Sequence, residues 1–74
     1  MVVEVRLFAS FRAGRFKEKE LELPEGSSLG DLLAQLEIAK KDAKITIVNG
    51  SAVSAEHELA EKDVIAIFPP IAGG

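Results

Sequence analysis

One segment of the chain has apolar residues at helical spacing, and the segments on both sides of it alternate with the period of a β-strand. The helical segment carries four leucines at positions i, i+3, i+4 and i+7, namely Leu29, Leu32, Leu33 and Leu36. That spacing forms a single apolar stripe on a helix of about 10 residues, which can cover one face of a small sheet. The pattern therefore predicts a two-layer α+β domain.

Five short segments have the composition of strands: residues 2–9, 17–23, 45–48, 51–53 and 63–68. In the first of these, the alternation directs Val3, Val5 and Leu7 to one face. In the second, Leu21 and Leu23 point inward while the glutamates between them point to solvent. Both segments are typical of strands that bury one face against a helix.

Turn and cap residues separate these segments. Gly14 lies in a loop that joins the first two strands into a hairpin, and Asn49-Gly50 is a strong turn signal after the third strand. Ser28 is suited to cap the helix, because Asp31 then occupies N3, which gives a weaker version of the capping box and also suits the helix dipole. We expect a hairpin, a capped helix and a second hairpin in that order.

The predicted element order is β-β-α-β-β-β, with Ile38 extending the leucine stripe and Leu59 filling the core from a loop. The first and last strands are strongly apolar, so we expect them to lie parallel at the centre of the sheet. This is the β-grasp, or ubiquitin-like, arrangement, a mixed sheet of four to five strands packed on one helix. We expect residues 1–68 to form this domain and residues 69–74 to form a flexible, extended C-terminal tail.

Composition excludes several classes of function. The chain has 74 residues, no cysteine and one histidine, which removes disulfides, thiolate metal sites and histidine clusters. A net charge of −3 argues against a protein that binds a nucleic-acid backbone. No apolar run approaches the roughly 20 residues of a membrane span, and the N-terminus has no signal-peptide pattern. We therefore expect a cytoplasmic protein that binds neither nucleic acid nor membrane.

The residues for an independent catalyst are scarce. His57 is the only imidazole and lies in a polar stretch that is typical of a solvated turn. The acidic residues Glu18, Glu20 and Glu22 occupy every second position of a predicted strand, which is typical of the solvent-exposed face of a sheet. We expect no catalytic residue, no metal site and no bound cofactor in this chain.

The last six residues, Pro69-Pro70-Ile71-Ala72-Gly73-Gly74, hold the strongest functional signal. The two prolines stiffen the exit from the last strand, and the side chains then shrink to two glycines, which can thread a slot too narrow for a Cβ atom. Six extended residues reach at most about 20 Å, which is far enough to place a terminal carboxylate inside a partner's active site. That carboxylate needs activation, for instance by adenylation, before it can react.

An apolar patch is predicted beside this tail. Phe8 has outward parity in the first strand, and Ala66 and Phe68 have outward parity in the last. If those strands are neighbours, the three side chains lie on the sheet face away from the helix, where an apolar patch usually marks an interaction surface. The alternative is that one or both rings fold over an edge or into the core.

Three stretches resemble the MoaD/ThiS family of ubiquitin-like sulfur carriers: residues 63–74 with the double proline and terminal glycines, Val5-Arg6-Leu7-Phe8-Ala9-Ser10-Phe11-Arg12, and Val48-Asn49-Gly50. Within the family the chain is most similar to the MoaD branch, the small subunits of molybdopterin synthase. The resemblance covers essentially the whole chain.

The resemblance implies a carrier that is a co-substrate of other enzymes. An E1-like adenylyltransferase of the MoeB/ThiF type would use Mg-ATP to form a glycyl adenylate on Gly74. A sulfurtransferase system would supply the sulfur of a Gly74 thiocarboxylate (1-thioglycine). The tail would then enter a large synthase subunit of the MoaE type, in a heterotetramer, and deliver sulfur for the dithiolene of molybdopterin. The catalytic residues would belong to the partners.

The resemblance also implies roles for individual positions. Gly73 and Gly74 would be the reacting end of the tail, Pro69 and Pro70 would set the direction in which the tail leaves the last strand, and Ile71 and Ala72 would lie between them. Phe8, Phe68 and Ala66 match the partner-facing surface, and a further contact position falls near Ala52, where relatives can carry a larger apolar residue. The pair Lys40-Lys41 matches no family role.

Three other interpretations remain open. The chain could be a related carrier with another client, either a ThiS-like donor for the thiamin thiazole or a carrier for a tungsten cofactor or another thiocarboxylate pathway, although ThiS-like tails usually lack the double proline. It could be a ubiquitin-like modifier whose Gly74 is joined to lysines. It could also be a β-grasp binding module with an idle tail, in which case removal of Gly73 and Gly74 leaves its function intact.

Overall fold

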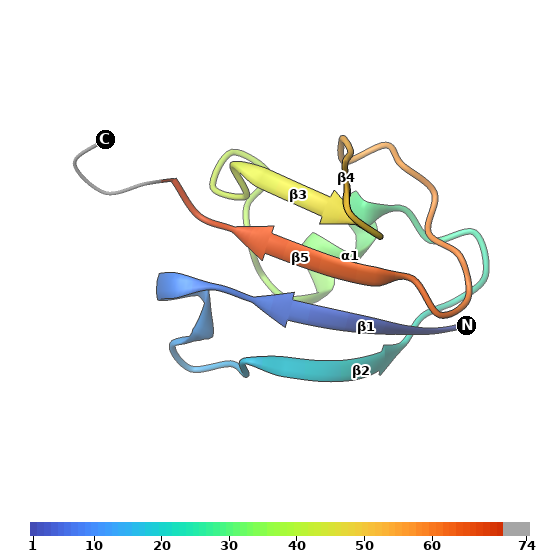
Figure 1. The fold of residues 1–74 in the computed structure, drawn as a ribbon, viewed down its shortest axis with the longest axis horizontal. Coiled ribbons are helices and arrows are strands. Elements are labelled where there is room, and N and C mark those ends of the chain that lie inside the picture. Colours follow the sequence, from blue (N-terminus) through green and yellow to red (C-terminus); the bar gives the residue numbers. More distant parts are fainter. Residues whose placement is uncertain (71–74) are drawn as a thin grey trace.

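The computed structural model describes residues 1–70, which form a five-stranded sheet with one α-helix packed across one of its faces (Figure 1). The elements are β1 (Val2–Leu7), the short 3-10 helix η1 (Ala9–Arg12), β2 (Glu18–Glu22), α1 (Leu29–Gln35), β3 (Ile45–Val48), β4 (Ser51–Ala52) and β5 (Val64–Phe68). The strand order is β2-β1-β5-β3-β4, with β1 and β5 parallel and the other neighbours antiparallel. The predicted β-grasp arrangement with a parallel central pair is confirmed.

The core lies between the sheet and α1. The inward residues of the two central strands are fully buried: Val3, Val5, Leu7, Ile65 and Ile67. From the helix, the buried leucines are Leu29, Leu32 and Leu33, while Leu36 at the C-cap is half-buried. These are the faces that the period-two and period-3.6 patterns predicted, because each side chain's parity decides whether it meets the opposite layer.

The helix begins as predicted and ends earlier. Ser28 caps it in a full capping box with Asp31. The expected helix of about 10 residues has 7, because Glu37 adopts φ 60° and the amide of Ile38 turns back to donate to Leu33 O at 2.9 Å. Ile38 is buried, but it closes a Schellman motif instead of extending the helix.

Two loops tie the helix ends to the sheet. At the C-terminal end, Arg15 Nε donates to Leu36 O at 3.0 Å. At the N-terminal end, the amides of Leu29 and Gly30 donate to His57 O and Ala55 O in the long loop before β5. The first amides of α1 are therefore paired by the protein itself.

The β1 strand ends two residues before the predicted boundary of 2–9. Ala9, the first residue of η1, has φ 53°, which no strand residue adopts, and Phe11 within η1 is buried. β3 has the predicted bounds, whereas β2, β4 and β5 are one or two residues shorter than their predicted segments.

The β3–β4 hairpin has the predicted two-residue turn. Val48 pairs with Ser51, so that only Asn49 and Gly50 form the connection. Both have positive φ, 52° and 87°, as a type I′ turn requires. Glycine and asparagine are the residues that adopt this conformation at least cost.

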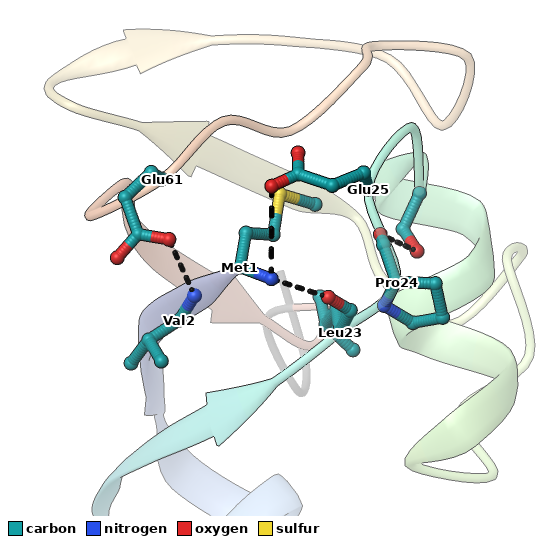
Figure 2. A network of polar contacts seen from close by, with 7 residues as sticks. Met1, Val2, Leu23, Pro24, Glu25 and Glu61 are labelled. Carbon is teal, nitrogen blue, oxygen red and sulfur yellow. Dashed lines mark hydrogen bonds and ion pairs between the residues drawn. The ribbon is translucent and has the colours of Figure 1, made fainter.

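Hydrogen bonds anchor Met1 and Val2 to neighbouring segments of the fold (Figure 2). The Met1 nitrogen donates to Leu23 O at 2.8 Å, and the Val2 amide donates to Glu61 Oε1 at 2.9 Å. Leu59, in the same loop as Glu61, is buried and fills the core as predicted. These contacts secure the end of the sheet opposite the end of β5.

Within residues 1–70, α1 is the longest helix, and no helix there is long and apolar enough to cross a membrane.

Candidate functional site

The sheet face opposite α1 carries an apolar surface at the end where β1 and β5 finish. Because β1 and β5 are parallel neighbours, with Leu7 opposite Ile67, the next residues Phe8 and Phe68 emerge side by side. Ala66 and Phe68 are half-buried, whereas Ile65 and Ile67 between them are fully buried. The outward parity predicted for the last strand is therefore observed.

The two phenylalanine rings stack on each other. Their centroids are 4.2 Å apart and their planes differ by 11°. Both rings are half-buried, and neither belongs to the buried core cluster. The alternative in which a ring folds into the core is thus not what the structure shows, because both side chains keep part of their surface exposed.

Arg12 extends this stack, which the sequence did not predict. Its Nε donates to Leu7 O at 2.7 Å, and its guanidinium carbon lies 5.2 Å from the centroid of the Phe8 ring. A guanidinium over a ring face is an attractive cation–π arrangement. Arg12 reaches this place because η1 turns the chain back after Ala9, a bend that the alternating pattern did not reveal.

Two isoleucines of β3 widen the apolar surface. Ile45 pairs with Phe68 and is 45% exposed, and Ile47 pairs with both Ala66 and Ala52. Residues 45–48 are apolar at both parities apart from Thr46, so the sequence alone did not show that Ile45 and Ile47 face outward. Thr46 faces the helix side, and its hydroxyl donates to Val53 O at 2.6 Å. Apolar side chains on the exposed face of a strand are typical of an external contact surface.

Together, six residues define what we term the open apolar face: Phe8, Ile45, Ile47, Ala52, Ala66 and Phe68. Ala52 is exposed at its β4 edge, so this predicted contact position lies at the rim of the face. The assignment of these residues to a partner contact remains a prediction.

The chain leaves the sheet directly from this face. The Lys44 amide donates to Phe68 O at 3.0 Å, and the ladder stops there because Pro69 and Pro70 have no amide hydrogen. Pro69 is half-buried and Pro70 is exposed. The predicted tail residues Ile71, Ala72, Gly73 and Gly74 lie outside the described residues.

The remaining candidate groups are not gathered into a site. His57 lies in a turn, where its amide donates to Ser54 O, and Glu18, Glu20 and Glu22 are exposed along β2. Lys40 and Lys41 are exposed in the loop after α1. Among residues 1–70, no three histidine or acidic side chains are grouped so that they could hold a metal ion.

Comparison with known proteins places this geometry in a family. The sequence model of the ThiS family matches residues 5–74. The chain belongs to the ThiS family. The match includes both phenylalanines of the stack and the whole of residues 69–74, so the resemblance inferred from the motifs is confirmed at the level of the family.

Solved structures that resemble this chain are consistent with its membership of the ThiS family. A putative molybdopterin converting factor, subunit 1, from Pyrococcus furiosus is 34% identical, with a TM-score of 0.75 over 96% of this chain and 99% of that one. The small archaeal modifier protein 1 of Haloferax volcanii is 23% identical, with a TM-score of 0.77 over 95% and 98%. Subunit 1 in a complex of subunits 1 and 2 of molybdopterin-converting factor from Helicobacter pylori is 24% identical, with a TM-score of 0.66 over the full length of both chains. The last two likenesses concern the fold alone.

Proposed function

We propose that this ThiS-family chain is a sulfur carrier that serves as the small subunit of a molybdopterin synthase, with Gly74 as its reacting end. The observation that carries the proposal is the junction at the end of β5. There a stacked aromatic pair on an open sheet face leads straight into Pro69-Pro70 and the glycine-ended tail. The similarity to a molybdopterin converting factor subunit over nearly both whole chains supports this choice of client.

The chemistry of the tail starts from an unreactive carboxylate. In the proposed cycle, a carboxylate oxygen of Gly74 attacks the α-phosphorus of ATP in an E1-like enzyme with Mg²⁺, and pyrophosphate leaves. The terminal sulfur of a sulfurtransferase persulfide then displaces AMP, and a thiol reduces the resulting acyl disulfide, which releases the thiocarboxylate and leaves a disulfide on the donor side. Delivery of that sulfur to the pterin precursor returns the carboxylate and completes the cycle.

The folded domain supplies the docking that makes such a short tail effective. Stacked rings with two isoleucines beside them form a preformed apolar surface, which costs little entropy to bind. Once this surface is docked, the stiff proline exit aims the tail in one direction, and the domain itself stays outside the partner's active site. Binding energy from the open apolar face is thereby used to position Gly74.

The direct test is intact mass after incubation with an E1-like activator, Mg-ATP and a sulfur source, followed by iodoacetamide. The chain has no cysteine, so rapid alkylation that maps to the C-terminal peptide reports a thiocarboxylate on Gly74. A chain that lacks Gly73 and Gly74 serves as the control and must remain unmodified. If the full chain is also unmodified by an activator that works on its own carrier, the sulfur-carrier proposal is wrong.

The client is tested by pairing with a large synthase subunit of the MoaE type from the same source. The related H. pylori subunit 1 was solved in complex with subunit 2, which makes this the first partner to try. We expect a heterotetramer that converts pterin precursor to dithiolene only when the carrier is thiocarboxylated. Failure with a competent large subunit, together with activity toward a thiazole synthase, would favour the ThiS-like alternative.

A second candidate is protein modification through Gly74. Its support is the likeness to the H. volcanii protein, whose name describes a modifier, although that likeness concerns the fold. The same activated glycine would react with a lysine amine in place of a sulfur donor. Lysine-linked adducts that carry the Gly74 carbonyl, found in cells that express the full chain and absent without Gly73 and Gly74, would support this candidate.

A further inference from the structure

Asn49 is the only asparagine in the chain, and it is followed by Gly50. An Asn-Gly pair is chemically labile, because glycine has no side chain to shield its backbone nitrogen from the neighbouring amide carbon. The pair lies at the exposed tip of the β3–β4 hairpin, where solvent has access to it. Its position alone would therefore make it prone to deamidation.

The structure holds the Asn49 side chain at both of its polar atoms. Its Oδ1 accepts a hydrogen bond from the Val64 amide at 2.9 Å, and its Nδ2 donates to Asp63 Oδ1 at 2.8 Å. The second oxygen of Asp63 accepts from the Ala60 amide at 2.8 Å, and the Asp63 side chain is largely buried. We term the three residues Asn49, Asp63 and Val64 the clasp.

We propose that Asn49 is a modification site at which the clasp suppresses deamidation in the folded protein and at which the reaction, once it occurs, opens the clasp permanently. In the reaction the Gly50 nitrogen bonds to Cγ of Asn49 and ammonia leaves. Water then opens the succinimide ring at one of its two carbonyls, which leaves aspartate or isoaspartate. No oxidant, reductant or enzyme is needed.

Suppression follows from the geometry of the clasp. For attack, the Asn49 amide has to rotate so that Cγ faces the Gly50 nitrogen, and this rotation breaks both side-chain hydrogen bonds. It would also leave the buried Asp63 carboxylate without one of its donors, which is costly in a partly buried site. Deamidation in the native state therefore requires local opening at the start of β5.

Irreversibility follows from the charge of the product. A carboxylate at position 49 cannot donate to Asp63 and instead places a second negative charge at hydrogen-bond distance from it. The isoaspartate product also lengthens the backbone of a turn that fits the register only with two residues. The modification thus marks molecules that have opened and prevents their clasp from closing again.

The experiment follows deamidation of the full chain by intact mass and by the 45–62 tryptic peptide, in mildly alkaline buffer with and without urea. We expect the native chain to react at least about tenfold more slowly than the unfolded chain. In the native chain, Asp63→Ala should accelerate deamidation of Asn49 by about the same factor, because it removes the acceptor for Nδ2. Leu36→Ala, which destabilises the far end of α1 and leaves the clasp intact, is the control and should react far more slowly than Asp63→Ala.

Equal rates in native and unfolded chains would overturn the proposal, as would equal native rates for Asp63→Ala and Leu36→Ala. The product is tested separately through Asn49→Asp, compared with Asn49→Gly, which keeps the positive φ and also lacks the clasp. We expect the aspartate variant to melt at a lower temperature than the glycine variant at neutral pH. If it melts at the wild-type temperature, the clasp does not open permanently and that part of the proposal fails.

Discussion

The two ends of β5 are built in opposite ways. At its start, the clasp joins a buried carboxylate, an amide side chain and the Val64 amide, and the Ala60 amide also donates to Asp63, in hydrogen bonds of 2.8 to 2.9 Å. At its end, the strand finishes with stacked rings, a guanidinium over one of them and a single backbone bond to Lys44. The start of β5 is therefore held by directional polar contacts, whereas its end carries an apolar and partly exposed surface.

The difference separates stability from recognition within a single strand. Hydrogen bonds at the start fix the register of β5 against its neighbours, and that register is what brings Phe68 beside Phe8. Rings at the end keep an outer surface that nothing in residues 1–70 covers fully, so burying it against a partner still yields free energy. Substitutions at the two ends should therefore affect different measurements.

The largest expected effect lies beyond the aromatic end. Gly74→Ala should reduce thiocarboxylate formation by about a hundredfold or more, because the new methyl group displaces the carboxylate from the adenylation geometry. The melting temperature should stay at the wild-type value. Alkylation-coupled mass spectrometry and a thermal melt provide the two readings, and efficient thiocarboxylation of this variant would contradict the proposed role of the tail.

The second-largest effect is expected when the clasp at the start of β5 is disrupted. Asp63→Ala should lower the free energy of unfolding by about 3 kcal/mol, since it removes a charged acceptor from two donors and leaves them partly buried. Urea titration measures the loss. Partner affinity of the folded fraction should be unchanged, and a variant that keeps its stability but loses affinity would reverse the comparison.

A smaller effect is expected at the aromatic end. Phe68→Ala should weaken binding to the large subunit by about tenfold to a hundredfold, or about 1.4 to 2.8 kcal/mol, because it removes one ring of the docking surface. Its cost in stability should be less than that of Asp63→Ala, since the ring is only half-buried. Calorimetric titration beside a urea titration separates the two, and a large stability loss with normal binding would assign Phe68 to the core.

The smallest effect is expected at Glu37, a position outside both ends of β5. Glu37→Gly should raise the free energy of unfolding by about 0.5 to 1 kcal/mol, because glycine occupies the φ of 60° without steric strain. Binding and thiocarboxylation should not change. A decrease in stability would mean that the glutamate side chain contributes more than its backbone conformation costs.

Much of the fold could be predicted because its signals are local. The capping box at Ser28, the turn at Asn49-Gly50 and the parity of β1 and β5 each depend on residues close together in the chain. Contacts between distant segments were not predictable in the same way. Arg12 was missed because its place over Phe8 depends on η1, and Asp63 was missed because its partner Asn49 is 14 residues away.

The sequence alone determined the layers, the inward faces and the point where the last strand stops, because period, cap and proline chemistry act within a few residues. It also carried the tail motif on which the resemblance to the MoaD/ThiS family rests. Only the tertiary structure decided that Phe8 stacks on Phe68, that Ile45 and Ile47 enlarge their face, and that Asn49 is clasped to Asp63. Those contacts arise from strand pairing, which brings together side chains that no local pattern relates.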